Sequence, residues 1–123
     1  MKITLVADDA IRLEQTGGSM TIEAASADQL YSPFHMLASG LAFCTLSVLM
    51  SWASHAKLEA GDLAIEVKWA FAEEPHRVGS MDMKIVWPSL PSGRERTAER
   101  TAALCAIHAT LTQPPSITTV LSR

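Results

Sequence analysis

The chain lacks most of the motifs by which common enzyme classes are identified. It contains no GxGxxG or Walker loop, no GxSxG elbow and no cysteine pairs at zinc-finger spacing. The nucleotide-binding, hydrolase and structural-zinc classes therefore lack their usual signatures. The four histidines are scattered, and none forms an HxxxH pair on one helix. The sequence therefore predicts neither a metal site nor a cofactor.

The sequence also lacks any excess of positive charge. Its formal net charge is -3 and its pI is about 5.7, so it has no electrostatic footprint for nucleic acid or for an anionic membrane. The N-terminal segment lacks the apolar core of a secretory signal. We therefore expect a cytoplasmic protein, with no nucleic-acid or membrane partner.

Charged residues are missing altogether from Gln29 to Ala56, a span long enough to raise the question of a membrane helix. Serines, Thr45 and two histidines interrupt this span, and basic clusters do not flank it. We interpret it instead as a helix buried nearly all round within a protein. A sheet and other helices, from the same or a second subunit, must then surround it.

The remaining pattern predicts a single domain over residues 1–123 with six strands. Ser32 and Pro33 mark the start of the uncharged helix, which should end by Gly61. A capping box of Ser92 and Glu95 predicts a second helix to about Leu111. Alternating apolar residues predict a three-strand meander before the first helix, over 3–13 and 20–24. They also predict a hairpin between the helices, over 63–71 and 81–87, and a closing strand over 117–121. This order is typical of an α+β fold with helices packed on an antiparallel sheet.

Cys44 and Cys105 are the only cysteines, one in each predicted helix. In a reducing compartment such a pair is catalytic, redox-active or simply buried and inert. Cys44 shares a helical stripe of small residues with Gly40, Ser47 and Ser51, and Cys105 lies on a similar small face of the second helix. If these faces meet, the thiols come within bridging distance.

These segments resemble the OsmC/Ohr family of thiol peroxidases. The resemblance rests on Ser32-Pro33 eleven residues before Cys44, on the apolar helix, and on the later ALCAIHATL segment that contains Cys105. It implies an OsmC-like fold, an antiparallel sheet wrapped around a long central helix, and an intertwined homodimer.

The resemblance also implies roles for particular residues. Cys44 would attack a small organic hydroperoxide and become a sulfenic acid, Cys105 would resolve it as a disulfide, and a dithiol would reduce that disulfide. Family members activate the first thiol with an N-terminal arginine held by a glutamate. Arg12 is the candidate arginine, and an exposed surface arginine is the alternative interpretation. His35 occupies the position at which some members carry the glutamate, although it suits a helix cap equally well.

Two other functions stay open at this stage. The first is a non-catalytic OsmC-like dimer that binds a small apolar ligand, since the glutamate is missing. The second is a structural dimer whose thiols are inert core atoms.

Overall fold

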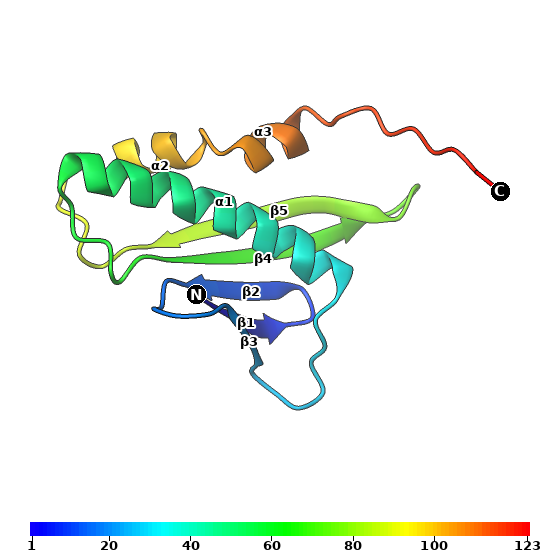
Figure 1. Cartoon of the computed structure of the whole chain (residues 1–123), viewed down its shortest axis with the longest axis horizontal. Helices are drawn as coiled ribbons and strands as arrows, with labels where there is room; N and C mark the ends of the chain where they lie inside the picture. Colours follow the sequence, from blue (N-terminus) through cyan, green and yellow to red (C-terminus); the bar gives the residue numbers. More distant parts are fainter.

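The first two strands form the hairpin expected from their alternating pattern. The computed structural model, which describes residues 1–123, places β1 at Lys2–Ala7 and β2 at Ala10–Glu14, paired antiparallel (Figure 1). Successive side chains of a strand point to opposite faces, so the apolar residues share one face. This face is fully buried at Ile3, Leu5, Ile11 and Leu13.

The clearest predicted strand is confirmed as β4 (Ala64–Ala72), which forms a long hairpin with β5 (Arg77–Val86). β4 also pairs antiparallel with β2 and so joins the two hairpins into one sheet. Its inward residues Ile65, Val67 and Trp69 are at most 1% exposed. Full burial of such a side chain contributes about 1.5 to 3 kcal/mol each to folding.

The third strand contradicts the predicted meander. β3 (Thr21–Ala24) pairs in parallel with β1, and the strand order is β3-β1-β2-β4-β5. Because β4 occupies the second edge of β2, the chain after β2 must return to the open edge of β1. All four residues of β3 are exposed, so the alternation around Ile22 does not mark a buried face in this protomer.

The uncharged segment forms α1 (Pro33–Ala56), which starts where the sequence predicted. Ser32 caps the helix by accepting a hydrogen bond from the N–H of His35. The His35 ring completes a capping box, because Nδ1 accepts from the backbone N–H of Ser32 at 3.1 Å. Nε2 donates to the carbonyl oxygen of Ala7 at 3.1 Å and ties the helix start to the first hairpin. His35 is 2% exposed and packs edge-on against Trp69.

One face of α1 packs on the sheet and α2, with Ala42, Leu46, Leu49 and Ala53 at most 2% exposed. The opposite face is exposed, which differs from the expected burial nearly all round. Length and composition alone would let α1 cross a membrane, but a core helix of a soluble protein passes the same test. The packing of its buried face is that of a core helix.

The predicted second helix is two helices, α2 (Glu95–Ala102) and α3 (Ala106–Thr112), lying beside α1 (Figure 1). The prediction of a capping box at Ser92 and Glu95 is wrong. The chain turns at Gly93, and α2 starts after Arg94 without a side-chain cap. Cys105 interrupts the helix because its backbone is extended, with φ of -60° and ψ of 128°.

The closing strand predicted over 117–121 does not form in this chain. Residues 113–123 have no regular structure and run away from the body of the molecule (Figure 1). Ile117, Val120 and Leu121 are more than 80% exposed. A strand needs a neighbour for its backbone groups, and no edge of this protomer's sheet lies against the segment.

The position of His35 predicts the stability of the α1 start. We expect His35→Ala to lower the free energy of unfolding by about 2 to 4 kcal/mol, because the cap is weakened and the Ala7 carbonyl loses its donor. His35→Gln should lose less, since glutamine is a usual capping-box partner at this position. Urea denaturation at fixed protein concentration measures both. His55→Ala, at an exposed histidine of the same helix, is the matched control and should change little. Equal stabilities of the His35→Ala and His55→Ala variants would contradict the capping role.

Candidate thiol site

The structure brings the two cysteines together. Cys44 lies in the middle of α1, and Cys105 is the residue directly before α3. Their side chains lie close enough for each thiol to shift the pKa of the other, and both are free thiols. Cys105 is completely buried, whereas Cys44 is partly exposed at the edge of the open α1 face. Of the two sulfurs, Cys44 is therefore the one a small molecule can reach.

The surroundings shift the two pKa values in opposite directions. Burial raises the pKa of Cys44, and the interaction with the Cys105 thiol raises it further. The N–H groups of Ile107 and Ala106 lower this pKa, but by less. Burial would also raise the pKa of Cys105, but donors overcome it and lower that pKa. The first donor is the Cys44 thiol, followed by the His108 N–H, the Thr45 hydroxyl and the Ile107 N–H. The negative charge of a singly deprotonated pair therefore resides on Cys105, with the shared proton on Cys44.

The break between α2 and α3 supplies these donors. The His108 N–H donates to Cys105 Sγ at 3.4 Å, so the thiol occupies the place of a helix-capping oxygen. If the helix were continuous, as the sequence predicted, this N–H would be bonded within the helix. The extended backbone at Cys105 is thus what turns the N–H groups towards the sulfur.

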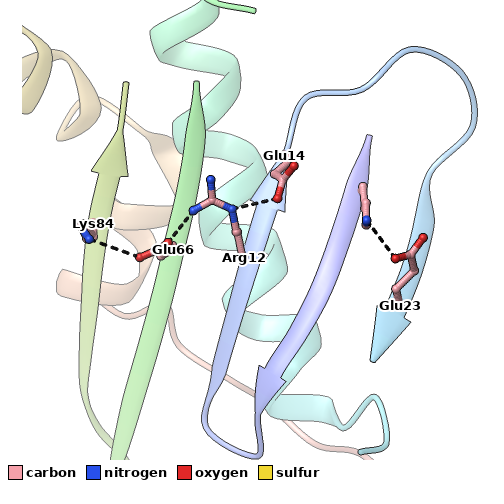
Figure 2. Close-up of polar contacts among 6 residues, drawn as sticks. Arg12, Glu14, Glu23, Glu66 and Lys84 are labelled. Atoms are coloured by element: carbon pink, nitrogen blue, oxygen red, sulfur yellow. Dashed lines mark hydrogen bonds and ion pairs between the residues drawn. The ribbon is translucent and has the colours of Figure 1, made fainter. Parts of the chain in front are cut away.

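Arg12 lies away from the thiols. Its neighbours Ile11 and Leu13 point into the core, so the guanidinium projects from the sheet face opposite α1 (Figure 2). Nε donates to Glu14 at 2.8 Å, and Nη1 donates to Glu66. Lys84 approaches the second oxygen of Glu66 at 3.7 Å. The sheet separates Arg12 from Cys44, and Glu14 and Glu66 already pair with its charge.

His35 does not reach the thiols either. Cys44 lies nine positions further along the helix. This spacing places it about 13 Å away along the axis and half a turn around it. Its two ring nitrogens are engaged by Ser32 and by the Ala7 carbonyl. The geometry gives this histidine a helix-capping position within the protomer.

An apolar cavity of about 600 Å³ lies between α1, β5 and α3, and neither cysteine lines it. Leu41, one turn before Cys44, forms part of its wall. His108, whose N–H bonds to Cys105, forms another part. The remaining lining residues are Phe34, Leu37, Arg77, Val78, Gly79, Ser80, Met81, Leu111 and Thr112. A small apolar molecule would fit in this cavity.

Sequence reasoning missed Thr45 and the backbone donors of 106–108. Thr45 directly follows Cys44, and its position on the buried stripe of the helix was the available signal. The backbone donors had no signal, because the pattern of 95–111 predicts one continuous helix. The cavity was missed since its walls come from three elements distant in sequence.

Comparison with known proteins identifies a family and a fold. The OsmC-like protein family model matches residues 26–120. An OsmC-like hydroperoxide resistance protein from Jannaschia sp. CCS1 has a similar structure, with a TM-score of 0.58 and 24% identity over 80% of this chain and 70% of that chain. A structure from Psychrobacter arcticus 273-4, described as an osmotic stress induced and detoxification response protein, has a TM-score of 0.61 and 18% identity over 88% of this chain and 84% of that chain. No protein of curated function matches the sequence.

At these identities the two solved structures establish likeness of fold, and they share the mixed α+β architecture described above. The family match rests on the sequence itself and spans most of the chain, from before α1 to the C-terminal segment. This chain therefore belongs to the OsmC-like protein family.

Proposed function

We propose that this protein reduces organic hydroperoxides through its two thiols. The observation that carries the proposal is the proximity of a partly exposed Cys44 to a buried Cys105 of lowered pKa. An apolar cavity lies between the helices that carry these residues and β5. Two thiols in contact can form a disulfide without large movement of the backbone. The cavity offers room for the organic part of a hydroperoxide.

The first step is attack of the Cys44 sulfur on the terminal oxygen of the hydroperoxide. The Cys105 thiolate accepts the proton of Cys44 as the S–O bond forms and the O–O bond breaks. The leaving alkoxide takes up the proton that Cys105 accepted and becomes the alcohol, so Cys105 is again a thiolate. Sulfur is oxidised to the sulfenic acid, and the peroxide is reduced. The shared proton between the two thiols thus supplies the activation that neither Arg12 nor His35 provides within the protomer.

The second step joins the two sulfurs. Cys105 attacks the Cys44 sulfenic acid, the S–S bond forms, and the oxygen leaves as water. An external dithiol then reduces the disulfide by thiol exchange and restores both thiols. This cycle requires a reducing compartment, and we place the protein in the cytoplasm.

Hydroperoxide treatment tests the cycle. We expect one equivalent of cumene hydroperoxide to convert the reduced protein into a Cys44–Cys105 disulfide, detected by mass spectrometry of the non-reduced digest. Cys105→Ser should stop at a Cys44 sulfenic acid that dimedone traps. Cys44→Ser should abolish peroxide consumption, because the buried Cys105 cannot be reached.

The serine variants are a matched pair, since each removes one sulfur and keeps nearly the same shape. Absence of both the sulfenic acid and the disulfide in the wild-type protein would overturn the proposed cycle. Peroxide consumption at the wild-type rate in Cys44→Ser would instead show that the assignment of the attacking sulfur is wrong.

A second candidate function is non-catalytic binding of a small apolar ligand, which the cavity favours. Six of its eleven lining residues are leucine, phenylalanine, valine or methionine. A fluorescent apolar probe should bind both the wild-type protein and Cys44→Ser if this function holds, and neither should consume hydroperoxide. Turnover with a dithiol reductant that depends on Cys44 would rule it out.

We further propose that the active form is an intertwined homodimer. The open face of α1 carries Met36, Gly40, Phe43 and Ser47 and has no charged residue. Met36 and Phe43 are 60% and 46% exposed, which is unusual for apolar residues of a core helix. A second copy of the same face would cover them, because a small and uncharged stripe permits close helix packing. Cys44, at the edge of this face, would then lie near the interface.

The C-terminal segment supports the same assembly. Its alternating Ile117, Thr119 and Leu121 suit a strand, yet the protomer offers it no partner. The exposed edge of β3 in a second copy would supply the missing backbone groups. Exchange of this segment between two copies makes the dimer intertwined.

A charge at the open α1 face tests the dimer. We expect Phe43→Glu to convert the protein from dimer to monomer in sedimentation analysis, since a carboxylate would be buried without a partner. Val6→Glu is the control, because Val6 is also about half exposed, at 49%, but lies on β1 and away from α1. A wild-type protein that sediments as a monomer at micromolar concentration would contradict the proposal.

A further inference from the structure

Thr45 has a buried hydroxyl group for which the resting structure provides no ordinary partner. The residue is fully buried, and its Oγ1 is one of two buried side-chain polar atoms without a hydrogen bond of normal geometry. Two other hydroxyls of α1 bond one turn back, that of Ser39 to the His35 carbonyl and that of Ser47 to the Phe43 carbonyl. Thr45 does not do so. A buried hydroxyl without a partner destabilises the fold, so a second reason for its presence is needed.

The neighbour of this hydroxyl is Cys105. Both side chains are 0% exposed, and Thr45 Oγ1 lies beside Cys105 Sγ from the α1 side. A neutral thiol is a weak acceptor, which explains why the contact does not reach normal geometry. A thiolate is a much stronger acceptor, because hydrogen bonds to charged groups are stronger than those between neutral groups.

We propose that Thr45 is a positioning residue that holds Cys105 as the attacking thiolate while the Cys44 sulfenic acid is resolved. This inference rests on the peroxidase cycle proposed above. The hydroxyl donates to the Cys105 sulfur before attack, and the interaction weakens when the charge disappears in the disulfide.

The need for Thr45 arises from the first chemical step. In the resting pair, the Cys44 thiol is the main donor to Cys105. Oxidation removes that thiol hydrogen, because the Cys44 sulfur then carries oxygen. Of the donors to Cys105 in the reduced site, the N–H groups of His108 and Ile107 remain, and Thr45 is the side-chain donor among them.

The step is balanced without a further reagent. The Cys105 sulfur attacks the Cys44 sulfur, the S–S bond forms, and the S–O bond breaks. The leaving hydroxide takes up one proton and becomes water. Cys105 sulfur is oxidised, Cys44 sulfur is reduced, and Thr45 keeps its own proton throughout.

Few titratable groups face Cys105. Cys44 approaches it from α1, and His108 belongs to α3 itself and lines the cavity. Arg77 of β5 lines the same cavity. These groups are unchanged by a substitution at Thr45, so a change in pH dependence would report on the hydroxyl.

Single-turnover kinetics of Thr45→Val and Thr45→Ser test the role. Valine keeps the volume and removes the hydroxyl, whereas serine restores it. We expect Thr45→Val to slow formation of the Cys44–Cys105 disulfide about three- to tenfold at neutral pH and to move its pH midpoint up by about half to one unit. Dimedone should trap correspondingly more sulfenic acid. Thr45→Ser should return both values towards wild type, which a purely structural role would not produce.

A second measurement does not depend on peroxide. In the Cys44→Ser background Cys105 is the single thiol, and ultraviolet absorbance follows its ionisation. Adding Thr45→Val should raise the midpoint of that titration. The free energy of unfolding in urea should stay at least as high as in the parent variant. An unchanged midpoint, or disulfide formation at the wild-type rate in Thr45→Val, overturns the role of Thr45. A wild-type protein that forms no sulfenic acid overturns the peroxidase cycle instead, so the two failures are distinguishable.

Discussion

The packing of one face of α1 on the sheet is the constraint on which the rest of the structure depends. Leu46 and Leu49 are buried with Leu13 and Ile65 in one core, so the rotation of the helix about its axis is determined. That rotation places Thr45 in the core and Cys44 at its border. It also leaves a strip of small and apolar residues facing outwards. Access to the thiol, the proposed dimer and the environment of the second cysteine all follow from this single orientation.

The interruption before α3 gives the site its chemical character. A continuous helix would carry Cys105 as an ordinary buried side chain with a raised pKa. The extended backbone at Cys105 instead turns N–H groups towards its sulfur and lets it contact Cys44. The buried thiol is thereby the more acidic of the two, and the accessible thiol holds the proton. Such an arrangement suits a pair in which one sulfur accepts the proton that the other must lose before it attacks.

The candidate residues differ in how well the sequence could locate them. The cysteines were found because two rare residues lay on small helical faces, and α1–α3 packing brings these faces together. Arg12 was chosen from its place in the N-terminal strands, but strand alternation puts it opposite α1, where Glu14 and Glu66 bind it. His35 was placed at a helix start, and the structure shows it completing the cap. The geometry of the chain does not bring either residue to the thiols.

The sequence by itself determined the α+β class, the start of α1 and the long β4–β5 hairpin, because these depend on local periodicity and capping. Only the tertiary structure decided the parallel pairing of β3, since β4 occupies the edge of β2 that a meander needs. It also decided the break at Cys105, the cavity and the environment of Thr45. These features arise from contacts between segments far apart in the chain, and local pattern carries no information about such contacts. The C-terminal segment shows the same limit: its alternation predicts a strand, but a strand forms only where a neighbour can pair with it.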